Sequence, residues 1–257
     1  MILAFDIEHT DFPDPAKGVI AIGGVVKDAQ TGRCLNIFKF PMYIQNVHSF
    51  SKRCWNEFWK GKEDVLEQIK ASPKLLNDCP IDKTPIEHIE YQAIFAFTNW
   101  CREWEALARV QGKTFTRVTD NKLADPVRLN ALIRKYLPPE HPVFPYSFTN
   151  PAEYGKLWET NSMARGYLLA NGIPDENKVG HLIREIHGLP KVSNVPYDHV
   201  PWNDAAYIAD SYIQLLRVAV LRESKLAELE AKLGRETLEP YEGLLEHIDP
   251  RRKKRKT

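Results

Sequence analysis

Two carboxylates near the start of the chain are separated by one aliphatic residue. The first ten residues are an apolar run broken by Asp6 and Glu8. If the run is a strand, alternation places these two acids on one face and turns Phe5 and Ile7 into the opposite layer. Like charges held side by side repel each other, and a bound divalent cation is the usual reason to keep them there. Surface strands also carry such pairs, but the apolar flanks favour a metal site at the end of a buried strand.

Further carboxylates follow a short β-rich segment at residues 114–118. Asp125 precedes Pro126, a residue that suits the first position of a helix, so Asp125 can also be explained as a helix N-cap with no chemistry. Asp120 lies five residues earlier and competes with Asp125 as a candidate metal ligand. Asp120 and its neighbour Asn121 are also suited to a turn.

A histidine and a carboxylate occur together where a late helix is predicted to begin. Four residues separate His199 from Asp204, and the segment 199–209 is expected to open a long helix. An imidazole with a pKa near 6.5 can accept a proton at neutral pH. Most loop histidines have no such role, but this spacing at a helix start favours a general base beside a metal ligand.

Three strands are predicted at the N-terminal end of the chain. Residues 19–27 are a β-branched run, and residues 34–42 alternate apolar and polar side chains. Tight turns join them to the acidic strand, which indicates an antiparallel meander. Gly23 and Gly24 lie inside the second strand, where glycine marks a bulge or a close approach.

Helices dominate the rest of the chain. Residues 84–110 are predicted to be a helix, with Thr84 as its cap and Pro85 in its first turn, and Gly112 follows its end. Further helices are expected over residues 152–171 and 177–187. An ordered loop rich in proline is expected over residues 137–151.

An aromatic and basic segment covers residues 50–60. Aromatic rings among cations can stack on bases and bind phosphates, which makes Trp55 a candidate for substrate contact. Trp55, Phe58 and Trp59 are also spaced as one face of a helix, and a buried helical face is the interpretation we favour.

Composition restricts the class of protein. The chain has 257 residues, 43% of them hydrophobic, enough for one sizeable core with insertions. Six of the 35 Lys and Arg residues form one run at 251–256, which leaves 29 basic against 34 acidic residues elsewhere. A body with a charge of about −5 would bind nucleic acid through a local site rather than through a general positive field.

Targeting and redox features are few. Asp6 and Glu8 interrupt any signal-peptide core, and no apolar run is long enough to cross a membrane, so we expect a soluble intracellular protein of the cytoplasm or nucleus. The basic run at 251–256 also fits a nuclear-import signal. The cysteines, whose spacing suits no zinc site, are expected to be reduced thiols: Cys34, Cys54, Cys79 and Cys101.

These motifs in this order resemble the DEDDh exonucleases, the DnaQ-like branch of the RNase H-like fold, over roughly residues 1–220. The Asp120-Asn121 pair before the third acid and the Pro201-x-Asn203-Asp204 segment after the histidine are most similar to exonucleases of large DNA viruses. The resemblance implies an α/β fold, with a mixed central sheet and helices on both faces. It implies one domain over residues 1–242, with helical insertions, and a basic tail over residues 243–257.

The resemblance also implies a reaction and a site. The activity would be 3′-to-5′ hydrolysis of DNA or RNA to nucleoside monophosphates, in roles such as proofreading and DNA repair, with two Mg²⁺ ions that Mn²⁺ can replace. Asp6, Glu8, Asp125 and Asp204 would hold the metals and His199 would be the general base. The family places the third acid at a helix start, which favours Asp125 over Asp120, although Ala124 stands where the family has a large apolar residue. Substrate contacts would come from Ile7, His9, Thr10, Asn121 and Trp55.

Two classes of function remain. The first is the metal-dependent exonuclease, whose partner is single-stranded or 3′-ended DNA or RNA and not a membrane. The second is a catalytically silent nucleic-acid-binding or assembly module with the same fold. Retention of all five acid and histidine groups argues for the enzyme.

Overall fold

The computed structural model describes residues 1–11, 17–45, 48–70, 85–121, 124–138, 157–170 and 197–233. The chain divides into two compact units, Met1–Ile213 and Gln214–Thr257, and the sheet and all candidate site residues lie in the first. The predicted tail at 243–257, the loop at 139–151 and the helix at 177–187 fall outside the described residues. The domain boundary at residue 242 therefore stays a prediction.

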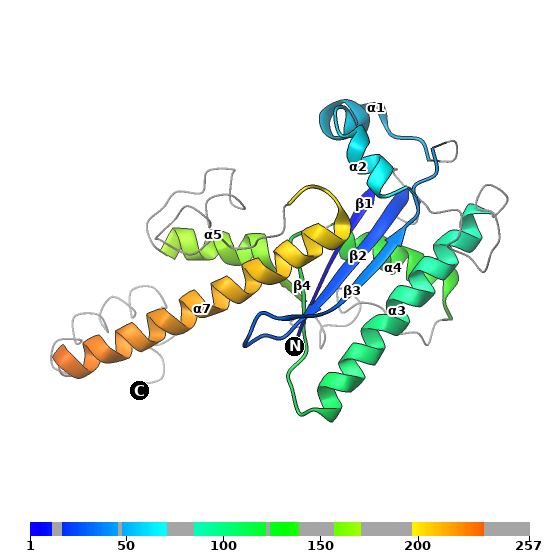
Figure 1. Cartoon of the computed structure of the whole chain (residues 1–257). Coiled ribbons are helices and arrows are strands. Elements are labelled where there is room, and N and C mark those ends of the chain that lie inside the picture. The colour runs from blue at the N-terminus through cyan, green and yellow to red at the C-terminus, as the bar shows by residue number, and fades with distance from the viewer. Residues whose placement is uncertain are drawn as a thin grey trace, which may run out of the picture. The chain divides into compact units, whose positions relative to one another are not determined.

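A five-stranded mixed sheet forms the centre of the first unit (Figure 1). The strands are β1 (Ile2–His9), β2 (Val19–Lys27), β3 (Cys34–Pro41), β4 (Thr116–Thr119) and β5 (Leu157–Glu159), and they lie side by side in the order β3-β2-β1-β4-β5. β1, β2 and β3 are antiparallel to one another, which confirms the predicted meander, whereas β4 and β5 join in parallel. The acidic strand β1 is thus the central strand.

The side chains of β1 alternate between two hydrophobic cores, one on each face of the sheet. Leu3, Phe5 and Ile7 face a cluster formed with α3 (Ile86–Val110) and α4 (Asp125–Tyr136). Ile2 and Ala4 face a second cluster, with residues 205–213 of α7 (Pro201–Leu233). Figure 1 shows α3 and the start of α7 on opposite sides of the sheet, so helices cover both faces, as predicted.

Two glycines of β2 allow helices to approach the sheet closely. A Cβ placed on Gly23 would lie 2.1 Å from the carbonyl carbon of Pro201, and one on Gly24 would lie 2.8 Å from the Trp100 ring. Gly23 is also the β-ladder partner of Asp6. The absence of a side chain at Gly23 therefore sets the start of α7 directly beside the acidic end of β1, where the predicted close approach is confirmed.

A helical segment between β3 and α3 lies beyond the end of the sheet at which β1 finishes (Figure 1). It consists of α1 (Lys52–Cys54), the π-helical turn η1 (Trp55–Trp59) and α2 (Glu63–Gln68). The Trp59 side chain is fully buried and its indole Nε1 donates to the His9 carbonyl at 3.2 Å. Trp59 belongs to a buried hydrophobic cluster, and Trp55 and Phe58 pack against this cluster but are only partly buried. The predicted buried helical face is therefore confirmed for Trp59 alone.

Two predicted boundaries are wrong. The helix expected from residue 152 is preceded by β5, because residues 157–159 pair with β4, and α5 begins only at Thr160 (Thr160–Ala170). α3 begins at Ile86 with Pro85 as its N-cap rather than in its first turn, and Pro85 makes no side-chain capping bond. The cap predicted at Thr84 lies outside the described residues.

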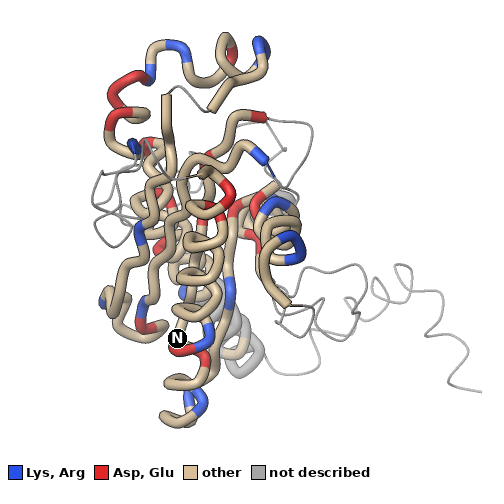
Figure 2. The backbone as a smooth tube through the Cα atoms, turned by 90° about the vertical axis from the view of Figure 1, so that its right-hand side faces the viewer, with Lys and Arg blue, Asp and Glu red and all other residues tan. Residues whose placement is uncertain are grey.

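The basic run at 251–256 lies outside the described residues. Acidic and basic positions are interspersed along the described backbone (Figure 2). Cys34 is exposed, Cys54 and Cys101 are buried, and all three are free thiols. Within the described residues, no helix is both long enough and apolar enough to cross a membrane.

Candidate metal and catalytic site

Asp6 and Glu8 lie on the same face of β1, as predicted. Both residues are buried, each with 7% of its surface exposed, and both side chains point toward the layer of α7. β4 runs parallel to β1, with Ala4 opposite Val118, so the chain that leaves β4 reaches Asp120 beside Asp6. The sheet therefore brings an acid from mid-chain to the acids of the first strand.

One ligand group combines three carboxylates. Oxygen atoms of Asp6, Asp120 and Asp125 all lie within 4.8 Å of one another. Asp120 accepts a hydrogen bond from the Tyr197 hydroxyl at 2.7 Å, and Asp125 accepts one from the Thr119 hydroxyl at 2.8 Å. Both candidates for the third acid are thus present in the same place.

The explanation of Asp125 as a helix N-cap is wrong. Ala124 already has helical backbone angles and is the cap, Asp125 is the first residue of α4, and Pro126 is the second. The backbone N–H of Asp125 donates to the Asn121 carbonyl at 3.1 Å, so the turn begins before Asp125. Among the described residues the Asp125 side chain accepts no backbone N–H of α4; it accepts the Thr119 hydroxyl and turns toward Asp6.

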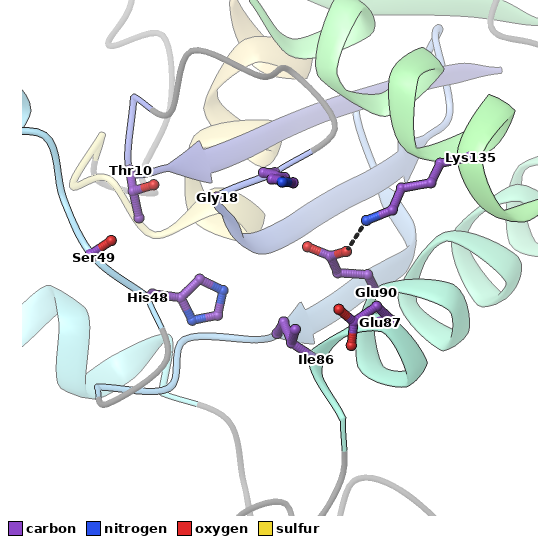
Figure 3. A pocket seen from close by; sticks show the side chains of 9 residues that line it. Thr10, Gly18, His48, Ser49, Ile86, Glu87, Glu90 and Lys135 are labelled. Carbon is purple, nitrogen blue, oxygen red and sulfur yellow. Dashed lines mark hydrogen bonds and ion pairs between the residues drawn. The ribbon is translucent and has the colours of Figure 1, made fainter.

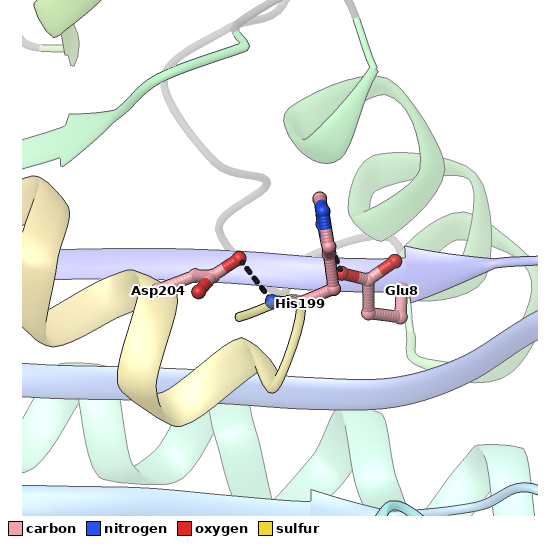
Figure 4. Close-up of side chains that lie close together, drawn as sticks. All are labelled: Glu8, His199 and Asp204. Atoms are coloured by element: carbon pink, nitrogen blue, oxygen red, sulfur yellow. Dashed lines mark hydrogen bonds and ion pairs between the residues drawn. The ribbon is translucent and has the colours of Figure 1, made fainter. Parts of the chain in front are cut away.

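A second ligand group lies on the same strand. Atoms of Glu8, His199 and Asp204 lie within 4.8 Å of one another, and Figure 4 shows the three side chains together. His199 Nδ1 is 3.8 Å from Glu8 Oε1. The predicted association of His199 with Asp204 is therefore observed, and it includes Glu8.

Hydrogen bonds hold the loop before α7 in its shape. The Asp204 carboxylate accepts the backbone N–H of Asp198 at 2.9 Å and that of His199 at 3.2 Å. His199 has a φ of 63°, a left-handed backbone conformation that residues other than glycine adopt infrequently. Because each carboxylate oxygen has a second lone pair, Asp204 can fix this loop and still bind a cation.

Sequence reasoning missed Asp198. Its Oδ1 accepts the Val200 N–H at 3.2 Å, and both of its oxygens accept from the Asn203 amide, at 3.3 and 3.1 Å. An Asp whose side chain accepts the N–H two residues further on forms a recognised type of turn, and Asp198 does so three residues before α7 begins. Asp198 supports the position of His199 through the backbone.

The carboxylates of the site are buried, which disfavours their charged forms and raises their pKa values. Burial raises the pKa of Asp6, and the charges of Asp125 and Glu8 raise it further. Burial likewise raises the pKa of Glu8, of Asp125 and of Asp120, and it raises the pKa of Asp204 to about 8. Asp6 Oδ2 is buried and has no hydrogen-bond partner among the described residues. Such a set of oxygens is suited to a hard divalent cation, which supplies the missing positive charge.

The histidine has the opposite shift. Burial and, to a smaller extent, the charge of Lys62 lower the pKa of His199 to about 4. The imidazole is therefore neutral at neutral pH and can accept a proton.

The residues predicted to contact the substrate lie in different parts of the structure. His9 lines a cleft of about 360 Å³ next to Glu8, and the walls of this cleft also include Arg53 and Phe58. Asn121 is exposed beside the third acid, and its carbonyl accepts the N–H of Ala124 and of Asp125, so it shapes the turn. Trp55 is partly buried with its ring 5.4 Å from that of Phe50.

Two other predicted contacts lie away from the acids. The Ile7 side chain is buried in the core on the other face of β1, so only its backbone is available to a substrate. Thr10 lines a separate cavity of about 160 Å³, where Figure 3 also shows the ion pair of Glu90 with Lys135, 3.2 Å long.

No protein-family model matches the sequence, and no curated protein matches it. Among solved structures, the chain is similar to the nuclease domain of 3′hExo, a DEDDh family member, bound to rAMP. That match has 13% identity and a TM-score of 0.45, and it covers 84% of this chain and 90% of the other. A full-length 3′-exonuclease is similar at 13% identity and a TM-score of 0.46, over 85% of this chain and 81% of the other. At these values the likenesses establish no activity for this chain.

Proposed function

We propose that the protein is a metal-dependent exonuclease that hydrolyses the phosphodiester bonds of DNA or RNA from the 3′ end and releases nucleoside monophosphates. One observation carries the proposal: two ligand groups, each of three side chains, meet on the acidic face of β1, and Glu8 of one group also faces His199. The 3′-to-5′ direction rests on the motif resemblance alone. The same resemblance supports a nearest kinship with exonucleases of large DNA viruses.

The donor set suits Mg²⁺, which prefers oxygen ligands, and Mn²⁺ as its substitute. Asp6, Glu8, Asp125 and Asp204 would hold two ions, and Asp6 Oδ2, which is buried and has no hydrogen-bond partner among the described residues, is available as a ligand atom. Bound there, the ions would stabilise negative charge on the attacking and leaving oxygens of the phosphodiester. Asp120 lies in the same group of oxygens as Asp6 and Asp125 and accepts the Tyr197 hydroxyl, and the motif resemblance, which places the third acid at a helix start, favours Asp125 over Asp120 as the ligand.

His199 would act as the general base. The 3.8 Å between His199 Nδ1 and Glu8 Oε1 is longer than a direct hydrogen bond and suits a water molecule shared by the two groups. In our proposal Nδ1 accepts the proton of this water, and Glu8 orients it. The backbone bond from His199 N to Asp204 keeps the imidazole in place while the proton moves.

A gel assay tests the function directly. End-labelled single- and double-stranded DNA and RNA are incubated with the protein in Mg²⁺ and in a chelator. The proposal expects stepwise shortening from the 3′ end in Mg²⁺ only, and none with Asp6→Asn. Binding without shortening in Mg²⁺ and Mn²⁺ would instead identify the catalytically silent module.

A further inference from the structure

A lysine of the helical segment between β3 and α3 reaches the catalytic site. Trp59 anchors this segment to the end of β1 through the His9 carbonyl, and its neighbour Phe58 lines the same cleft as Glu8. The Phe58 ring packs edge-to-face against the His199 ring, with 4.6 Å between centroids. The ammonium of Lys62 lies over the same Phe58 ring, 3.7 Å from its centroid.

The Lys62 ammonium has no ion-pair partner among the described residues. Among the described residues, no carboxylate lies within ion-pair distance of its Nζ, although the charges of Glu8 and Asp204 act on it. Burial lowers the pKa of Lys62, and these two carboxylates oppose that shift. An ammonium that is half-buried over an aromatic ring has lost part of its hydration, and an anionic oxygen can replace the missing water.

We propose that Lys62 binds a non-bridging phosphate oxygen of the nucleic-acid strand at the catalytic site, with Phe58 holding its ammonium beside His199. The inference deepens the proposed function, because it names a substrate contact of the same site. The anion we assign to Lys62 is a phosphodiester, because this is the anionic group that the proposed function brings to the cleft lined by Glu8, His9 and Phe58. The neighbouring Arg53 forms an ion pair with Asp11 at 3.2 Å, whereas Lys62 forms no ion pair with any carboxylate in the part of the chain that the structure describes.

Equilibrium binding of a non-hydrolysable strand tests the assignment. The probe is a fluorescent ten-nucleotide DNA with a 3′ hydroxyl, in which methylene groups replace the bridging 3′ oxygens so that both non-bridging oxygens of each linkage remain, and it is titrated in Ca²⁺. Lys62→Met removes the charge but keeps a side chain that packs on Phe58, and Lys62→Gln is a second neutral variant in case the first fails to fold. Lys62→Arg keeps the charge, and Lys60→Met is the matched control, because Lys60 is exposed in the same segment.

We expect Lys62→Met to raise the Kd by about 10- to 100-fold, the range for loss of a hydrogen bond to a charged group. The slope of log Kd against log salt should fall by about one, whereas Lys62→Arg should retain most of the affinity and Lys60→Met nearly all of it. Equal Kd values for Lys62→Met and Lys60→Met would overturn the proposal. A lower metal-free Tm with an unchanged Kd would also overturn it and make Lys62 a structural counter-charge.

The two proposals fail in distinguishable ways. If the wild type binds the probe through Lys62 but shortens no strand in Mg²⁺, the phosphate contact stands and the exonuclease function fails. If the wild type shortens strands and Lys62→Met binds and cleaves equally well, only the role of Lys62 fails. Absence of any binding by the wild type would overturn both.

Discussion

Asp6 is the residue at which the site is least stable without a ligand. It is buried beside Glu8 and Asp125, and one of its oxygens has no hydrogen-bond partner among the described residues. Burying a charge without a partner costs several kcal/mol, and groups in this position often remain protonated instead. The fold therefore maintains Asp6 against its own stability, which is the expected behaviour of a ligand rather than of a structural acid.

We predict that Asp6→Asn abolishes hydrolysis and raises the Tm of the metal-free protein by a few degrees, because it removes one of the repelling charges. Thermal melting in a chelator measures the shift, and Mg²⁺ should stabilise the wild type more than the variant. Asp64→Asn, at an exposed position on α2, is the control and should change neither quantity. A large fall in Tm would show that the Asp6 carboxylate is structural.

His199→Asn separates proton transfer from metal binding. The four carboxylates remain, so we expect metal affinity near that of the wild type and a kcat lower by roughly 10² to 10⁴. Because burial lowers the pKa of His199 to about 4, the wild type should keep the neutral base down to mildly acidic pH. Isothermal titration and single-turnover kinetics give the two quantities. Near-normal turnover, or loss only through weaker metal binding, would leave Glu8 as the better candidate to orient the water.

Among the elements, β2 has an unexpected importance, because it positions the start of α7. Gly23 lies opposite Asp6 in the ladder and under the backbone of Pro201 and Trp202. This contact sets the distance between Asp204 on α7 and the acids on β1. The site thus depends on a residue that has no side chain and contacts no ligand.

Gly23→Ala should therefore damage both stability and activity. The added Cβ would meet Pro201 at 2.1 Å, and backbone cannot yield as a flexible side chain does. We expect a loss of about 1–3 kcal/mol in unfolding free energy and at least a tenfold lower kcat. Gly166→Ala in α5, where nothing lies within 4 Å, should be neutral or slightly stabilising. Urea unfolding and the cleavage assay compare the two, and equal effects would contradict this role of Gly23.

The sequence could predict those features of the fold and the site that depend on the local pattern of residues. The two-residue period placed Asp6 and Glu8 on one face of β1, and the spacing of His199 and Asp204 placed both at a helix start. The segment 157–159 was wrongly predicted to be helical, since its strand exists only through pairing with β4. The closeness of Phe58 and Lys62 to His199 could not be predicted either, because it depends on Trp59 anchoring a distant segment to the end of β1.

For the whole molecule, the raised pKa values give stability a definite dependence on pH. A buried acid with a raised pKa contributes stability below its unfolded pKa, and the contribution is lost as pH rises through its folded pKa. For Asp204 this window runs from about 4 to about 8, and Asp6, Glu8 and Asp125 shift in the same direction. The lowered pKa of His9, about 4, acts in the opposite direction below its ordinary value of 6.5.

We therefore predict that the metal-free protein loses about 1–2 kcal/mol of stability between pH 6.5 and pH 8. Mg²⁺ should reverse the trend, because cation binding requires the deprotonated acids. Melting curves in chelator and in Mg²⁺ across this range measure both slopes. A metal-free Tm that increases with pH over the same range would refute the electrostatic account of the site.

The basic run at residues 251–256 is expected to tether long substrates rather than to take part in hydrolysis. Its removal should leave kcat on a ten-nucleotide strand unchanged and weaken binding to long strands in a salt-dependent way. A variant with six Gln residues in the same place controls for length. A truncated protein that is inactive on the short strand would contradict this separation of roles.

The distribution of the ligands along the chain also has a consequence during synthesis. Asp6 and Glu8 are made about 200 residues before His199 and Asp204. At translation rates of roughly 5–20 residues per second, some tens of seconds pass before the last ligand exists. Until α7 emerges, a ribosome-bound chain displays the early acids without their histidine partner. Under the function proposed above, a nascent chain therefore stays inactive until α7 has been made.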